Sequence, residues 1–301
     1  MITSLNSANS TFLTNLNAIQ ARLATAENQL SSGLKIVNPS DSPDQISQLL
    51  ATRASLASVQ TINQNLVNTT AEVNTAETAL SNASDAIQQA QVLGSQGAST
   101  TATAATRQTL AGQIGDVITQ LVGIANTQAN GRYIFGGDSD QTAPYTVDLT
   151  QSNPISNYLG SSATRLAQNP DGSTFAVSES AQQIFDSPTT ANNVFSSLVA
   201  LRSALQNNDT TGISSALTTL GTASTYFQGQ LAFYGRVQDK VSNATNQGQS
   251  LVTTLQTQVS NIQDADLTQA ILELNQGETA QQAALQEKAA TPATSLFDFL
   301  K

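Results

Sequence analysis

The sequence contains no cysteine, no histidine and no tryptophan. Without cysteine the chain can form neither a disulfide framework nor a thiolate nucleophile. Without histidine it can build neither a serine–histidine–aspartate triad nor a typical zinc site. These absences exclude the commonest catalytic centres, so we expect a protein that is not an enzyme and that uses no cofactor and no metal.

Charge is also scarce in this chain. Charged residues make up 11% of it, about half the usual share, and the formal net charge is −10. The 11 basic residues are scattered and form no patch that could neutralise phosphates, so we expect no nucleic-acid binding. Ser, Thr, Asn, Gln and Ala predominate, which predicts a mostly neutral surface with little self-repulsion. Such a surface permits dense packing of many copies.

Long apolar runs are absent as well. No run approaches the roughly 20 residues that a membrane-spanning helix needs, so we expect no membrane insertion. The opening stretch MITSLNSANSTFLTNL has neither the basic nor the apolar region of a secretory signal peptide. Any export is therefore expected to use a route without a cleaved signal.

The main positive signal is a 3-4 spacing of apolar residues. The first stripe consists of Phe12, Leu16, Ile19, Leu23, Ala26 and Leu30. It is narrow, as in the seam of a coiled coil, and it stops at Gly33, before Pro39 and Pro43. Ser42 is predicted to cap the next helix, with Pro43 at its first position and Gln45 completing a capping box.

Two further helices are predicted in the first half of the chain. Apolar residues from Leu56 to Ala90 at 4-3 spacing predict a long helix over roughly 47–93. The stretch GSQGASTTATAA, residues 94–105, is predicted to be a polar loop. A third helix follows from about Leu110 and is expected to end at a cap formed by Asn130 and Gly131.

The character of the sequence then changes. Aromatic residues and glycines in RYIFGGDSDQTAPY, and a turn at residues 169–172 (NPDG) between two alternating segments, predict a small β-rich insert over 136–188. Asp138 and Asp140 lie beside two glycines, but a polar turn is favoured over a cation site. Asp264 and Asp266 are predicted to cap a helix start.

Helical spacing returns after Pro188 and continues through a last helix from about Asp266. We therefore expect a mainly α protein with a small β-rich insert, in which the N- and C-terminal segments form a long antiparallel helical rod and the β domain projects from it. The expected parts are an N-terminal assembly helix (1–42), a rod in two halves (43–135 and 189–262), the insert (136–188), and a C-terminal assembly helix with an apolar tail (263–301).

Several motifs resemble the bacterial flagellin family. LSSGLKIVNPSDSP (30–43) is similar to its N-terminal signature, and IANTQANGRYIFGGDSDQTAPY (124–145) is similar to its hook–filament junction branch. DADLTQAILELNQGETAQQAALQ (264–286) and SLFDFL (295–300) resemble the C-terminus of that branch. The motif and turn residues that carry the resemblance are Gly33, Asn38, Pro39, Asp41, Ser42, Pro43, Gly131, Arg132, Tyr133, Phe135 and Gly136.

The resemblance implies a structural, extracellular role in the flagellum, at the junction between hook and filament. The implied partners are the preceding hook-associated protein at the hook tip, flagellin, a ring of copies of this chain, and a cytoplasmic export chaperone. It further implies export through the flagellar type III apparatus. A filament flagellin with a short variable domain and, less favoured, an intracellular coiled-coil scaffold remain as alternatives.

The two ends of the chain are expected to be disordered in the monomer, because short seam helices are marginal alone. Neighbouring copies would then cover their apolar residues on assembly. The predicted assembly interface consists of Leu5, Phe12, Leu16, Ile19, Leu23, Leu30, Leu267, Ile271, Leu274, Leu285, Leu296, Phe297, Phe299 and Leu300.

Overall fold

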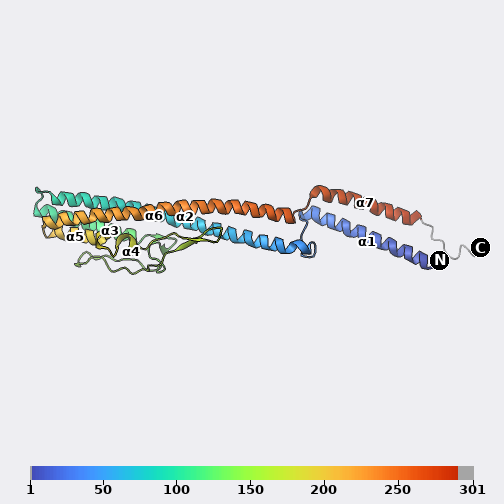
Figure 1. Cartoon of the computed structure of the whole chain (residues 1–301), viewed down its shortest axis with the longest axis horizontal. Helices are drawn as coiled ribbons and strands as arrows, with labels where there is room; N and C mark the ends of the chain where they lie inside the picture. The colour runs from blue at the N-terminus through green and yellow to red at the C-terminus, as the bar shows by residue number, and fades with distance from the viewer. Residues whose placement is uncertain (1, 291–301) are drawn as a thin grey trace, which may run out of the picture. The chain divides into compact units, whose positions relative to one another are not determined.

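The computed structural model describes residues 2–290, with side chains from residue 9 onward. The chain divides into two units, residues 1–58 with 252–301 and residues 59–251. The long helices are α1 (Ile2–Ser32), α2 (Pro43–Ala98), α3 (Ala104–Ala125), α5 (Val194–Gln206), α6 (Thr210–Gln263) and α7 (Leu267–Ala290) (Figure 1). The mainly α class with a small β insert is confirmed.

The short elements lie between α3 and α5. They are β1 (Gln128–Ala129), β2 (Arg132–Tyr133), β3 (Leu166–Gln168), β4 (Thr174–Ala176), α4 (Ala181–Phe185) and the 3-10 helix η1 (Thr190–Asn192). The strands form two separate antiparallel pairs, β1 with β2 and β3 with β4. The second pair is the predicted hairpin around residues 169–172, whose Gly172 has a φ of +90°. Much of the insert is irregular, so its β content is lower than its alternating pattern indicates.

In the larger unit, α2 and α6 lie side by side and antiparallel (Figure 1). Gln228 Nε2 donates to Ser84 Oγ at 2.7 Å, and Gln238 Nε2 donates to Asn74 Oδ1 at 2.9 Å. Residues later on α6 therefore meet residues earlier on α2. Buried residues recur every seven positions on both helices: Leu66, Val73, Leu80 and Ile87 on α2, and Leu220, Phe227, Tyr234 and Val241 on α6. Heptad spacing gives each helix one narrow buried stripe, and both stripes belong to one core with residues of α3, α5 and the insert.

The predicted loop over 94–105 is mostly wrong. Residues up to Ala98 belong to α2, and α3 begins at Ala104 with Thr103 as its N-cap. The glycines there serve close packing: a Cβ on Gly94 would lie 2.6 Å from Leu217 Cδ2, and one on Gly97 would lie 2.3 Å from Leu205 Cδ2. They were interpreted as helix breakers because glycine has both uses in proteins.

The predicted helix cap at Asn130 and Gly131 is also wrong. The third helix ends earlier, with Asn126 as its C-cap. Asn130 and Gly131 instead form the two-residue turn between β1 and β2, with φ values of +53° and +75°. An Asn-Gly pair with positive φ at both positions is typical of a type I′ hairpin turn, whose twist matches the flanking strands.

The remaining motif residues of this region anchor the insert. Phe135 is fully buried and packs edge-to-face against Phe185 and Tyr234, with ring centroids 6.5 and 6.1 Å away. Its carbonyl accepts hydrogen bonds from Ala181 N and from Tyr158 Oη. The aromatic cluster also contains Tyr145, Phe195 and Phe227. Because Phe227 and Tyr234 belong to α6, this cluster attaches the insert to the long helix.

The polar turn expected at Asp138 and Asp140 is present. Arg132 forms an ion pair with Asp140, whose carbonyl accepts from Tyr133 N at 2.8 Å. Gly136 is buried, and its carbonyl accepts from Ser161 N at 2.9 Å. These contacts close the turn on itself, and no group of three or more metal-ligating side chains occurs among the described residues.

The buried glycines yield a stability prediction. Gly97→Ala should lower the free energy of unfolding by about 1–3 kcal/mol, because Leu205 is fully buried and cannot move aside. Gly112→Ala on α3 is the matched control, since a Cβ there meets nothing within 4 Å. Alanine at this open helical site should raise stability by about 0.5–1 kcal/mol. Denaturant unfolding measures both, and equal stabilisation by the two variants would contradict the packing argument.

Candidate functional site: the paired terminal helices and their joint

The chain leaving α1 pairs with the chain leaving α6. Gly33 ends α1 with a φ of +71°, and its N–H donates to Gln29 O. Its carbonyl accepts from Ala265 N at 2.9 Å, and Leu34 forms an antiparallel bridge with Asp264. We call residues 33–42 with 260–266 the joint. In the joint, backbone hydrogen bonds hold the segment that follows α1 against the segment between α6 and α7.

Gln263 is the centre of the joint. Its main-chain carbonyl accepts from Lys35 N at 2.6 Å and from Ile36 N at 3.3 Å. Its side chain is buried, donates from Nε2 to Ile36 O, and accepts from Arg53 through Oε1. A buried amide whose two ends are both bonded orders its surroundings, because an unpaired one would be costly. Sequence analysis assigned this residue no role, and a lone glutamine gives no signal of one.

Asp41 orders the turn that precedes α2. Its Oδ2 accepts from Asn38 N at 2.7 Å and from Val37 N at 2.9 Å. These two backbone donors hold the pKa of the Asp41 carboxyl below its ordinary value. Pro39 is exposed within the same turn. The motif residues Asn38, Pro39 and Asp41 thus shape one backbone turn.

The start of α2 is partly as predicted. Pro43 is its first residue, as expected. The reciprocal capping box is wrong, since Ser42 Oγ donates to Asp44 Oδ1 at 2.8 Å and Gln45 Oε1 accepts from Lys35 Nζ at 3.3 Å. The carboxylate of Asp44, two residues farther on, is charged and accepts a stronger hydrogen bond than a neutral group does. It therefore competes for the serine hydroxyl.

At α7 the predicted helix-start capping is confirmed for one of the two aspartates. Asp266 Oδ1 accepts from Thr268 N at 2.9 Å and from Gln269 N at 3.1 Å. Asp264 instead accepts from the Ser260 hydroxyl at the end of α6. The two carboxylates therefore serve different helices.

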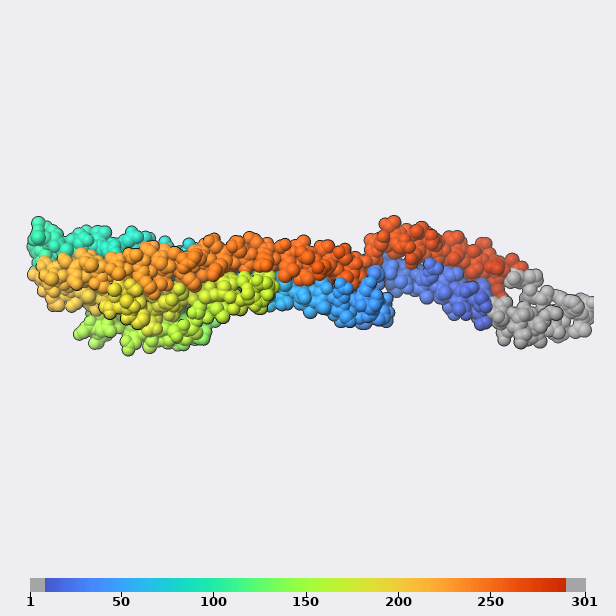
Figure 2. Space-filling model, viewed as in Figure 1, coloured from blue at the N-terminus to red at the C-terminus, as the bar shows by residue number. Residues whose placement is uncertain are grey.

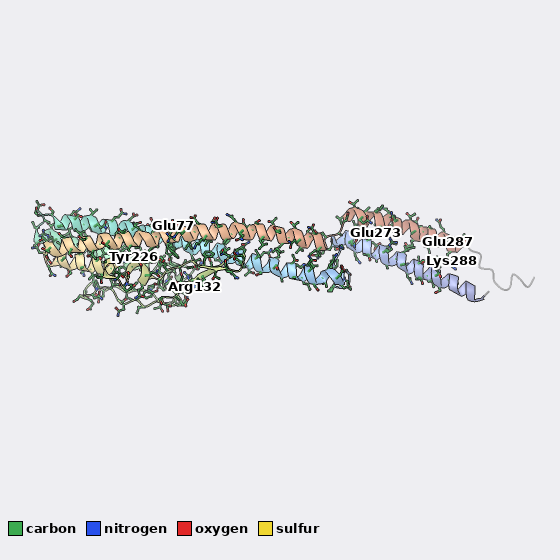
Figure 3. All side chains as sticks on the ribbon, in the orientation of Figure 1. Glu77, Arg132, Tyr226, Glu273, Glu287 and Lys288 are labelled. Atoms are coloured by element: carbon green, nitrogen blue, oxygen red, sulfur yellow. The ribbon has the colours of Figure 1, made fainter. Side chains whose placement is uncertain are left out.

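Beyond the joint, α1 and α7 lie against each other, blue and red in Figure 2. A Cβ on Gly277 would lie 2.7 Å from Leu23 Cδ2. Farther out, Lys288 Nζ donates to Asn9 Oδ1 and lies 5.5 Å from the centre of the Phe12 ring. Position 288 thus meets the start of α1 and position 277 its middle, so the pair is antiparallel. Figure 3 labels Glu273, Glu287 and Lys288 on α7.

The side of α7 that faces α1 differs from the predicted seam. Apart from Glu273, its least exposed positions follow a 4-3-4-3 spacing and are mostly small: Ala270, Leu274, Gly277, Gln281 and Ala284. Among the predicted residues, Leu274 is half-buried, but Leu267, Ile271 and Leu285 remain 46%, 46% and 50% exposed. Small residues let the two backbones approach closely, and the large apolar side chains lie beside the contact.

On α1 the predicted stripe does face α7. Leu23 is buried, and Phe12, Leu16 and Ile19 are half-buried. Leu30, near the joint, remains 40% exposed. The side chain of Leu5 and residues Leu296, Phe297, Phe299 and Leu300 lie outside the described residues. Sequence analysis missed Leu13, which is 56% exposed beside the stripe.

Comparison with known proteins finds similarity to flagellar proteins. Residues 3–140 match the bacterial flagellin N-terminal helical region. The chain is 34% identical over 165 residues to flagellar hook-associated protein 3 of Escherichia coli K12, covering 54% of this chain and 49% of that protein. It is 31% identical over 173 residues to the protein of the same name in Salmonella typhimurium LT2, covering 56% and 52%. It thus spans about half the length of these relatives.

A solved structure shares the fold. FlgL of Bacillus cereus superposes with a TM-score of 0.57 at 20% identity, over 70% of this chain and 99% of that one. The family match covers a little under half of the chain, and the similarity to hook-associated protein 3 covers about half of it. Over these stretches the chain is similar to flagellar proteins of the hook-associated protein 3 type. None of the described helices is long and apolar enough to cross a membrane.

The joint yields a pH prediction. Because the folded pKa of Asp41 is lowered, its stabilising effect should be present above its ordinary pKa of 3.8 and be lost as the pH falls through the folded value. In the state in which the joint is formed, hydrogen exchange at Val37 and Asn38 should therefore lose protection on acidification, and Asp41→Asn should show weak protection already at pH 7. The control is Asp116→Asn, which removes the same negative charge at an exposed position of α3. Unchanged protection in Asp41→Asn would contradict this role.

The register of α1 and α7 yields a crosslinking prediction. The chain has no cysteine, so Leu23→Cys with Gly277→Cys introduces one defined pair. In the paired state the Cβ positions are close enough for a disulfide, which should then form under mild oxidation. The control pair is Leu23→Cys with Glu278→Cys, whose second position is exposed and about 100° farther round α7. Faster crosslinking of the control pair on a non-reducing gel would rule out this register.

Proposed function

We propose that this chain is a structural subunit of the bacterial flagellum and forms the junction between hook and filament by packing of its terminal helices. The observation that carries the proposal is the apolar surface that α1 and α7 leave uncovered. Leu267, Ile271 and Leu285 on α7 are about half exposed. Grouped apolar exposure of this kind marks an interaction surface.

The geometry of α7 explains why one partner helix is insufficient. At 3.6 residues per turn, Leu285 lies directly in line with Leu267 five turns earlier, and Ile271 lies about 40° away. This apolar line runs beside the small-residue stripe that α1 covers. Burying a large aliphatic side chain completely gains roughly 1.5–3 kcal/mol, so three half-exposed ones supply a few kcal/mol per subunit. Neighbouring copies in a ring would provide that cover.

The names of the relatives support the location and partners. The proposed partners are the preceding hook-associated protein at the hook tip, flagellin and further copies of this chain. Family resemblance supports an extracellular position in the flagellum, reached through the type III apparatus without a cleaved signal. A cytoplasmic chaperone would hold the C-terminal region before export. The role is structural, with no catalysis and no cofactor.

The proposed division of labour follows the chain. Residues 1–42 and 263–301 are assembly segments that are disordered in the monomer and pair on assembly. Residues 43–135 and 189–262 are the two halves of the rod, and residues 136–188 are an outward insert. A filament flagellin would polymerise from seeds into long filaments, whereas a junction protein should stop after a short ring. Electron microscopy of hooks incubated with the purified chain distinguishes these two roles.

The exposed face of α7 yields an assembly prediction. Ile271→Asp combined with Leu285→Asp should leave a folded protein that cannot join hook and filament, because charges would be buried between subunits. Leu166→Asp is the matched control, since Leu166 is 63% exposed on β3 of the insert. The readout is motility of cells that carry each variant in place of the native chain. Normal motility with the α7 double variant would overturn the proposed interface.

The proposed order of events yields a second prediction. In the purified monomer, amides of 2–32 and 267–290 should exchange at nearly unprotected rates while those of 66–93 are protected. In assembled junctions the end segments should become protected, because their apolar faces are then covered. Exchange read peptide by peptide measures this. Full protection of both ends in the monomer would show that they pair before assembly.

A further inference from the structure

Glu179 is a half-buried carboxylate at the contact between the insert and α6. It lies between β4 and α4, and its main-chain N–H donates to Tyr234 Oη at 3.1 Å. Its side chain faces Gln230 of α6. Tyr226, also on α6 and labelled in Figure 3, donates through its hydroxyl to Gln183 O of α4 at 3.0 Å. Four groups thus form one hydrogen-bonded line from the insert to the long helix and back to α4.

The amide of Gln230 lies in the middle of this line. One end is 3.2 Å from Glu179 Oε1 and in contact with Oε2, and the other end is 3.0 Å from Tyr226 Oη. A side-chain amide is nearly symmetrical in shape, and it can turn by 180° without displacing its neighbours. Turning exchanges a donor for an acceptor at each end. The direction of the line is therefore set by the groups at its ends.

Two arrangements satisfy these groups, and they differ by one proton. With Glu179 protonated, its O–H donates to the Gln230 oxygen, the Gln230 NH2 donates to Tyr226 Oη, and Tyr226 donates to Gln183 O. With Glu179 ionised, the carboxylate is acceptor-only and requires the Gln230 NH2. The Gln230 oxygen then faces Tyr226, whose single proton must turn from Gln183 to Gln230.

We propose that one proton on Glu179 sets the direction of the line Glu179–Gln230–Tyr226–Gln183 and thereby makes or breaks the hydrogen bond that ties α4 to α6. The protonated form has the tie between Tyr226 and Gln183. The ionised form replaces it with a bond from Tyr226 to Gln230 of the same helix. Attachment of the insert at residues 179–183 thus depends on the protonation of Glu179. This holds independently of the proposed role at the hook–filament junction.

Burial places this change in the neutral range, against the effect of the one positive charge that acts on Glu179. Burial raises the pKa of Glu179 to about 7, and the positive charge of Arg236 acts in the opposite direction. Burial also raises the pKa values of Tyr226 and Tyr234, so both hydroxyls keep their protons near pH 7. Arg165, which also acts on Tyr234, is paired with Glu72 at 2.9 Å. Glu179 is therefore the group here that changes charge.

The sign of the effect follows from the raised value. A carboxyl whose folded pKa exceeds its ordinary 4.5 contributes stability that is full below that value and is lost as the pH rises through about 7. This pH dependence of stability agrees with the proposed hydrogen bonds, because only the protonated form has the bond from Tyr226 to Gln183 of α4. Proton loss removes that tie and places a charge in a partly buried site.

Side-chain NMR on the full chain between pH 5.5 and 8.5 tests the switch. The Gln230 NH2 and Tyr226 ring signals should titrate together near pH 7. Glu179→Gln should abolish both titrations, because its amide donates to Gln230 at every pH as the protonated acid does. Glu77→Gln, on α2 of the same unit, is the charge-matched control and should leave them unchanged. Titration of Glu179 near pH 4.5, or titrations that persist in Glu179→Gln, would overturn the proposal.

A second variant separates the switch from a general loss of structure. Tyr226→Phe removes the hydroxyl and should lower hydrogen-exchange protection across α4 several-fold at pH 5.5, where the tie exists. At pH 8.5 the same substitution should change α4 protection little, because the tie is already broken. Equal loss of α4 protection at both pH values would show that Tyr226 has a fixed structural role, and the proposal would fail.

Discussion

The structure depends on the need to cover narrow apolar stripes on long helices. A stripe with heptad spacing is hidden when other elements lie alongside it over its length. In the larger unit α2 and α6 are covered in this way together with α3, α5 and the insert, whose buried residues form one core. At the ends of the chain α1 and α7 cover each other only in part, since large side chains of α7 remain beside the contact. The same physical requirement thus produces a closed core in one place and an interaction surface in another.

Aromatic packing attaches the irregular insert to the long helix α6. Phe135, Phe185 and Phe195 come from the insert and its flanks, while Phe227 and Tyr234 come from α6. Large rings bury much area with few residues, which suits a segment with little regular structure. The polar line through Glu179 lies along the same contact, so the insert is held by apolar area and oriented by hydrogen bonds.

Much of the fold could be predicted from the sequence, because periodicity reports which residues face a partner. The seam of α2, the hairpin at 169–172 and the cap at Asp266 all follow from local patterns. Glycine was the main source of error, since Gly94 and Gly97 permit close packing rather than end a helix. Asn130 and Gly131 were assigned to a helix for a similar reason: positive φ suits both a cap and a hairpin.

The candidate site was less predictable than the fold. The apolar residues of α1 and α7 could be named, but of the face turned to α1 only Leu274 was among them, because most of that face is alanine, glycine and glutamine. Gln263 gave no signal, as its role comes from the meeting of two segments far apart in the sequence. Contacts of that kind become visible only once the topology is known.

The antiparallel match of Leu23 with Gly277 has a consequence for synthesis. A ribosome makes α1 first and α7 after all the other described helices, so the stripe on α1 lacks its partner helix until those helices have been made. Closing so long a loop is entropically slow compared with forming the neighbouring contacts of α3 and α5. Among the described helices, α1 and α7 are therefore the pair that can form last, and the nascent protein carries an uncovered stripe on α1 until then.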